Sequence, residues 1–125
     1  MKIAEVSERY GVSTDTLRYY ERIGLLRHVP RNRSGIRDYD EASCNAVEFV
    51  KCMRDAGMSI ESLVEYMELL DEGEATAGAR KDLLVRQSDA IRARIADLES
   101  ALARLEYKIE HYDDVMTETE RTLRP

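Results

Sequence analysis

Residues 3–24 read IAEVSERYGVSTDTLRYYERIG, and this stretch decides the fold of the N-terminal part of the chain. Val6 and Tyr10 are four residues apart and share one face of a short helix. Gly11 follows, a residue that accepts the positive φ of a tight turn. Ser13 is a good N-cap for a second helix, with Asp15 in its first turn.

The second helix is expected from about Thr14 to Arg22, with Gly24 ending it. Leu17 and Tyr20 are three residues apart and would face the first helix. Two short helices joined at a glycine predict a helix-turn-helix over residues 3–22.

Residues 27–39 are expected to form a basic wing after this motif. Ser34-Gly35 is a hairpin-turn signal. Arg33, Arg37 and Tyr39 flank the turn in a way that suits a short β-wing, although a solvated loop is the alternative.

Two further helices are predicted over residues 40–72. Asp40 caps the first of them, which runs to about Ala56 and ends at Gly57. Its expected apolar face consists of Ala42, Ala46, Phe49, Val50, Met53 and Ala56. Ser59 caps the second, whose apolar positions are Ile60, Leu63, Val64, Met67 and Leu70. This pattern predicts a helical hairpin that packs on the helix-turn-helix, so residues 1–72 form one domain.

The strongest periodic signal lies in the C-terminal third. After a linker at residues 73–79, neither Pro nor Gly occurs between residues 80 and 119. Apolar positions there alternate in steps of four and three residues, with Ser88 as the polar exception. They are Leu84, Ile91, Ile95, Leu98, Leu102, Leu105, Ile109, Tyr112 and Met116.

A repeat of 3.5 residues is typical of a coiled coil. The rest of the chain contains no segment long enough to cover this stripe. We therefore expect residues 80–119 to pair with a second copy in a homodimer, followed by a short tail at 120–125. The alternative is a helix that lies along a large bundle.

Charge is distributed unevenly along the 125 residues, whose formal net charge is −6. Residues 16–37 hold six arginines and a single acid, Glu21, which gives +5. Residues 41–125 hold 11 basic and 19 acidic side chains, which gives −8. The basic segment can therefore face a polyanion while the remainder keeps the chain in solution.

Several functional classes are disfavoured by the sequence. No apolar run approaches the length of a membrane span, and the N-terminus carries no signal-peptide pattern, so we expect a cytoplasmic protein without membrane contact. The chain offers no Ser-His-Asp set and no glycine-rich phosphate loop, so an enzyme is not expected. Only two cysteines and two histidines are present, and we predict neither a metal nor a cofactor.

A dimeric helix-turn-helix is suited to double-stranded DNA with pseudo-palindromic half-sites. The candidate base contacts are Thr14, Thr16, Arg18 and Tyr19. Arg33 and Arg37 are candidates for phosphate contacts, which position the protein without reading sequence. A solubilising surface, or a module that only tethers other proteins, is the alternative interpretation.

Residues 3–39 resemble the winged helix-turn-helix domain of the MerR family of bacterial transcription regulators. The segments that carry the resemblance are Ile3-Ala4-Glu5-Val6, Gly11-Val12-Ser13, Leu17-Arg18-Tyr19-Tyr20-Glu21, Gly24-Leu25 and Arg37-Asp38-Tyr39. The resemblance implies a mainly α fold in which the helical hairpin is a second wing and the long helix forms an antiparallel coiled coil.

The same resemblance implies a promoter with an overlong spacer, which an effector-bound dimer distorts so that RNA polymerase can engage it. It assigns Arg18, Tyr19 and Tyr20 to the recognition helix, and Arg33, Arg37 and Tyr39 to the first wing. It assigns Tyr66 to the second wing as a phosphate contact.

Cys52 is the candidate effector-sensing residue. The segment Phe49-Val50-Lys51-Cys52-Met53-Arg54-Asp55 is similar to an AdhR-like subgroup of thiol-based aldehyde and electrophile sensors. That similarity implies that Cys52 reacts with species such as formaldehyde or methylglyoxal. The residues alone disfavour a thiolate, because Glu48 and Asp55 are close on the same helix and its C-terminal end is near. A structural cysteine, in a regulator that answers another small ligand or none, remains the alternative.

Overall fold

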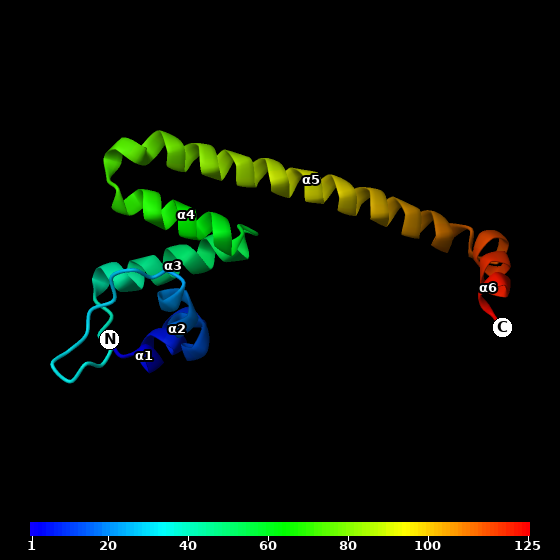
Figure 1. Ribbon diagram of the computed structural model, residues 1–125. Coiled ribbons are helices and arrows are strands. Elements are labelled where there is room, and N and C mark those ends of the chain that lie inside the picture. The colour runs from blue at the N-terminus through cyan, green and yellow to red at the C-terminus, as the bar shows by residue number, and fades with distance from the viewer. The chain divides into compact units, whose positions relative to one another are not determined.

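A computed structural model describes all 125 residues of the chain. It is helical apart from turns and loops (Figure 1). The chain divides into two compact units, Met1–Gln87 and Ser88–Pro125. No helix combines the length and the apolar character that crossing a bilayer requires.

The first unit begins with the predicted helix-turn-helix, formed by α1 (Ile3–Tyr10) and α2 (Thr14–Arg22). Gly11 takes φ 67°, a left-handed conformation that favours glycine over any residue with a side chain. The Ser13 side chain accepts a hydrogen bond from the Thr16 backbone N–H at 3.1 Å and so caps α2. Val6 and Leu17 are fully buried where the two helices meet.

The predicted wing is a loop with one isolated antiparallel bridge between Arg31 and Arg37, and no strand forms. Asn32 organises its tip, because its Oδ1 accepts from the backbone N–H groups of Ser34 at 2.9 Å and Ile36 at 3.1 Å. Gly35 takes φ 78° at the turn. The side chain of Asn32 therefore supplies hydrogen bonds that a longer β-ladder would otherwise provide.

The helical hairpin consists of α3 (Glu41–Asp55) and α4 (Ile60–Asp71), which lie side by side in Figure 1. Asp40 and Ser59 cap them as expected. The predicted apolar face of α3 is partly wrong. Its buried positions are Ser43, Val47 and Val50, whereas Ala42 and Ala56 are exposed.

One core unites the first unit. Its buried apolar residues are Val6, Leu17, Leu25, Leu26, Tyr39, Val47, Val50, Met58, Leu63, Met67 and Leu83. Leu83 belongs to α5 (Ala77–Glu110), so the first turns of the long helix are part of this core. The N-terminal domain therefore extends beyond the predicted boundary at residue 72.

The connection between α4 and α5 is shorter than the predicted linker. A 3-10 turn occupies Glu74–Thr76, and α5 begins at Ala77 with Gly78 inside it. The Thr76 hydroxyl donates to the carbonyl of Leu69 within 2.7 Å, which ties the turn to α4.

The second unit contains the rest of α5, a π-helical turn (Tyr112–Met116) and α6 (Thr117–Leu123). The predicted continuous helix over 80–119 therefore ends at Glu110, and part of the predicted tail is helical. Tyr112 Oη donates to Glu120 at 2.5 Å across this break. The two terminal positions of the predicted seam, Tyr112 and Met116, lie in the π-helical turn rather than in α5.

Candidate functional site

The candidate recognition helix α2 presents a polar face to solvent. Arg18 has a side chain 48% exposed, and its only ion pair is a 3.3 Å contact with Asp15, three residues earlier. Exposed pairs of this kind contribute little, so the contact with Asp15 does not fix the guanidinium in place. Thr16 accepts a hydrogen bond from the Ser13 hydroxyl at 2.8 Å, and Thr14 is half-buried.

Two tyrosines follow Arg18 on α2. Tyr19 and Tyr20 are half-buried, with their rings edge-to-face at 6.2 Å. The Arg22 guanidinium lies 5.4 Å from the centre of the Tyr19 ring. Tyr20 packs against the core, as the helix-turn-helix pattern predicts. A half-buried tyrosine can use its ring for packing and its hydroxyl for a polar partner.

The wing arginines predicted to hold phosphates have different surroundings. Arg33 is exposed at the tip and forms no ion pair. Arg37 is engaged with α2, because its Nε donates to Glu21 Oε2 at 2.8 Å. Arg31 Nη2 donates to the other oxygen of Glu21, also at 2.8 Å.

Tyr39 was predicted as a wing contact, and its position corrects that assignment. Its side chain is only 2% exposed and belongs to the core. The hydroxyl is buried without a hydrogen-bond partner. Burial and the nearby charge of Glu21 raise the pKa of Tyr39. The residue therefore anchors the end of the wing from inside.

Tyr66, the predicted second-wing contact, lies on α4 and is half-buried. Its ring stacks on Phe49 of α3, with centroids 5.4 Å apart and planes 29° apart. The stacking fixes the ring, and the hydroxyl has no hydrogen-bond partner within the protein.

The two cysteines occupy unlike positions on α3. Cys52 is exposed, whereas Cys44 is half-buried with its Sγ 3.9 Å from the Met1 sulfur. Cys44 packs against the core of the first unit. Next to Cys52, Lys51 pairs with Asp55 at 3.2 Å, which partly neutralises the carboxylate three residues after the cysteine. No group of three metal-ligating side chains is assembled anywhere in the chain.

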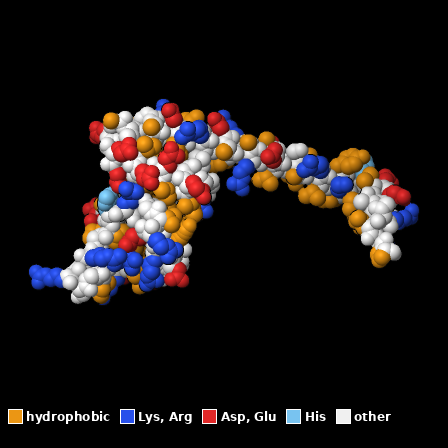
Figure 2. Space-filling model, in the orientation of Figure 1, with side chains coloured by type: hydrophobic (Ala, Val, Ile, Leu, Met, Phe, Trp, Pro, Cys, Tyr) orange, Lys and Arg blue, Asp and Glu red, His pale blue; other side chains and the backbone are white.

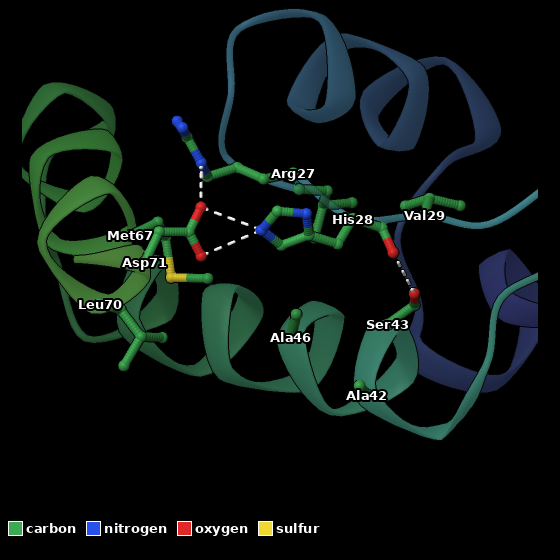
Figure 3. A pocket seen from close by; sticks show the side chains of 10 residues that line it. Arg27, His28, Val29, Ala42, Ser43, Ala46, Met67, Leu70 and Asp71 are labelled. Carbon is green, nitrogen blue, oxygen red and sulfur yellow. Dashed lines mark hydrogen bonds and ion pairs between the residues drawn. The ribbon is translucent and has the colours of Figure 1, made fainter. Parts of the chain in front are cut away.

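A charged cluster at the end of α4 was not predicted from the sequence. Asp71 accepts from Arg27 Nε at 2.5 Å, and both of its oxygens lie 3.0 Å from His28 Nε2 (Figure 3). The cluster closes one side of a cavity of about 180 Å³ between α3, α4 and the segment after α2. The cluster connects the start of the wing segment, residues 27 and 28, with the last residue of α4.

Lys and Arg side chains gather on the part of the first unit that contains the N-terminal helices (Figure 2). Sequence reasoning found most of these cations but missed the role of Glu21. The available signal was its isolation as the single acid among the six arginines of residues 16–37.

The second unit carries the unpaired seam. Five of its predicted residues in α5 are exposed large hydrophobics, reaching 67% for Leu98 and 72% for Ile109, and the others are Ile95, Leu102 and Leu105. Ile91 is half-buried, and Leu84 lies in the first unit against its core. Hydrophobic side chains are visible along the surface of this helix in Figure 2.

Comparison with known proteins places these features in one family. The model of the MerR helix-turn-helix regulatory proteins matches residues 1–70, and the MerR DNA-binding model matches residues 45–107. The transcriptional regulator AdhR of Bacillus subtilis is 55% identical over 84 residues, which are 67% of this chain and 60% of AdhR.

Solved structures agree. A MerR family regulator from Listeria monocytogenes has a TM-score of 0.80 at 43% identity, covering 98% of this chain and 93% of that one. HiNmlR, a MerR family regulator that lacks the sensor domain and was crystallised on promoter DNA, has a TM-score of 0.74 at 29% identity, covering 93% and 92%. With its helix-turn-helix, second helical hairpin and long C-terminal helix, the chain belongs to the MerR family of DNA-binding transcription regulators, which are not enzymes.

Proposed function

We propose that the chain acts in the cytoplasm as a homodimer that binds a pseudo-palindromic promoter and activates aldehyde-detoxification genes after modification of Cys52. The promoter would have an overlong spacer, which the modified dimer distorts so that RNA polymerase engages both of its elements. The proposal that Cys52 senses aldehydes is supported by its exposed thiol, which lies on α3, a helix whose buried face belongs to the core of the first unit.

The DNA-binding part is supported by the polar face of α2. Arg18 is the candidate for a bidentate contact to a guanine edge, with Thr14, Thr16 and Tyr19 beside it. Arg33 and the hydroxyls of Tyr20 and Tyr66 are candidates for phosphate contacts. HiNmlR, whose structure contains promoter DNA, supports the same class of ligand for this chain.

The dimer is supported by the exposed seam. An apolar stripe is exposed to water at a cost in free energy, and it consists of Leu98, Leu102, Leu105 and Ile109. Antiparallel pairing with a second copy would bury this stripe in a coiled coil. Two recognition helices related by a twofold axis would then match two half-sites.

The sensing chemistry is an addition of the Cys52 thiol to an aldehyde. A bond forms between Sγ and the carbonyl carbon, the carbonyl π bond breaks, and the thiol proton ends on the former carbonyl oxygen. The product is a neutral hemithioacetal, and the reaction needs no oxidant. Lys51, adjacent in sequence to Cys52, pairs with Asp55, so the carboxylate three residues after the thiol is already partly neutralised.

Replacing Cys52 with Ser tests the sensing. We expect Cys52→Ser to keep DNA affinity while the target promoter in cells no longer responds to formaldehyde or methylglyoxal. Cys44→Ser is the matched control on the same helix, and it should leave both properties unchanged. Normal induction with Cys52→Ser would reject sensing by this thiol and would favour a regulator that answers another small ligand or none.

A further inference from the structure

Glu21 is an acid on the element expected to face DNA. It lies in the last turn of α2 and is the single carboxylate among residues 16–37. A carboxylate near a phosphate backbone repels it, so on charge alone this residue should weaken DNA binding. Its contacts point to a different role.

The carboxylate of Glu21 binds two wing arginines at once. Oε1 accepts from Arg31 Nη2 and Oε2 accepts from Arg37 Nε, both at 2.8 Å. The side chains of Glu21 and Arg37 are 22% and 24% exposed, so this pair is partly shielded from water and from salt. Charge-assisted hydrogen bonds of this length are stronger and more directional than exposed surface pairs.

The two arginines are also the two partners of the only bridge in the wing. Arg31 pairs with Arg37 across the loop, and Arg31 Nη1 donates to the carbonyl of Gly35 at 3.3 Å. One side chain of α2 therefore holds both arms of the wing at their base. Because no β-ladder supports this loop, its position relative to α2 depends on such side-chain contacts.

The hydrogen bonds leave donors free on the arginines. Arg37 uses its Nε for Glu21, and neither of its Nη nitrogens has a partner in the protein. A guanidinium carries five N–H donors in a fixed plane. Fixing Nε therefore also fixes the direction in which the remaining donors of Arg37 are presented.

We propose that Glu21 is a positioning residue that holds Arg31 and Arg37 against the recognition helix so that both can contact the phosphate backbone on the same DNA site as α2. The proposal rests on the DNA binding proposed above. It predicts that loss of an acid weakens binding, which is the opposite of what charge repulsion predicts.

The test measures binding of the full-length chain to a DNA fragment from its own promoter at several salt concentrations. Binding by the unmodified chain is measured first, and its absence would reject the DNA-binding proposal rather than the role of Glu21. We expect Glu21→Gln to weaken specific binding about tenfold or more, because the arginines lose charge-assisted phosphate contacts. The slope of log affinity against log salt should become shallower by about one for each lost phosphate contact, and so by up to about four when both arginines of both protomers lose theirs.

Glu99→Gln is the matched control, since Glu99 is exposed on α5 in the second unit and the substitution changes charge equally. It should leave affinity and slope unchanged. Unchanged or tighter binding by Glu21→Gln, with an unchanged slope, would overturn the proposal. Thermal melting confirms that each variant is folded.

Should Glu21→Gln not fold, Glu21→Asp replaces it, because it keeps the charge but withdraws the carboxylate from the arginines. A loss of DNA affinity in Glu21→Asp would support the positioning role of Glu21, and normal binding by this variant would contradict it.

A double-mutant cycle separates positioning from general structural damage. In a chain that carries Arg31→Gln and Arg37→Gln, Glu21 has no arginine left to hold. Adding Glu21→Gln should then cause no further loss and should raise affinity, because only its repulsion of phosphate remains. A further loss in that background would show that Glu21 does not act through the two arginines.

Discussion

Asp71, the last residue of α4, binds His28 at the start of the wing segment 27–39, with Nε2 of the histidine 3.0 Å from both carboxylate oxygens. The two residues are 43 positions apart in sequence. Their contact connects the start of the wing with the end of α4, the helix that precedes α5. Arg27 Nε binds the same carboxylate, so Asp71 holds two consecutive residues of that segment.

The first prediction concerns the acid stability of this contact. Partial burial disfavours the charge of Asp71, but hydrogen bonds from His28 and Arg27 outweigh it and lower the pKa of Asp71. Its stabilisation is therefore present above about pH 4, where an unfolded aspartate is ionised, and is lost as pH falls through the lower pKa of the folded state.

We expect Asp71→Asn to lower the melting temperature at neutral pH and to flatten its decrease below pH 4. Asp82→Asn is the control, because Asp82 is exposed on α5 and forms no ion pair. Melting curves of both variants between pH 2.5 and 7 check the prediction. Parallel acid profiles for Asp71→Asn and the unmodified chain would contradict it.

The second prediction compares two leucines on α4. Leu63 is fully buried, whereas Leu70 is 42% exposed. Leu63→Ala should lower the free energy of unfolding by about 2–5 kcal/mol, since it removes core contacts and leaves a cavity. Leu70→Ala should cost less than about 1 kcal/mol. Urea denaturation at one fixed protein concentration measures both, and equal losses would be inconsistent with the described core.

How far the sequence predicts the fold depends on the type of signal. Capped helices were predictable, because Ser13, Asp40 and Ser59 mark their starts locally, and Gly11 marks the turn. The wing was not, since a hairpin turn at Ser34-Gly35 does not determine how many ladder bonds follow. In the structure the side chain of Asn32 closes the tip instead of a β-ladder.

Helical periodicity predicted which face of α3 is apolar only approximately. Alanines at 42 and 56 fit the pattern, but they are small, and the larger Val47 is the residue that enters the core. The same limit applies to Tyr39. A tyrosine next to a basic wing suggests a DNA contact, and only the three-dimensional packing shows that its ring fills the core.

The third prediction separates base contacts from phosphate contacts. Arg18→Ala should cost roughly 1–3 kcal/mol of specific binding and relax the sequence preference at one position of each half-site. Arg33→Ala should weaken binding to all sequences alike and make the salt dependence shallower by about one unit for each lost phosphate contact.

Arg104→Ala in α5 is the control with the same substitution, since Arg104 is exposed on the second unit. Fluorescence anisotropy measures the affinity with the promoter site, the sequence preference with single-base variants of it, and the salt dependence at several salt concentrations. Equal loss on specific and random DNA for Arg18→Ala would remove its role in base reading.

The fourth prediction concerns the apolar seam of the second unit. Leu102 is 54% exposed, and the proposed coiled coil would bury it against a second copy. Leu102→Asp should convert the protein to a monomer at micromolar concentration, because a charge cannot be buried there without a partner.

Ser100→Asp adds the same charge off the seam and should leave the dimer intact. Light scattering coupled to size-exclusion chromatography measures the mass of each. A variant that stays dimeric with Asp at 102 would show that the copies associate through another surface. The monomer should also bind the palindromic site more weakly, because each recognition helix then engages its half-site alone.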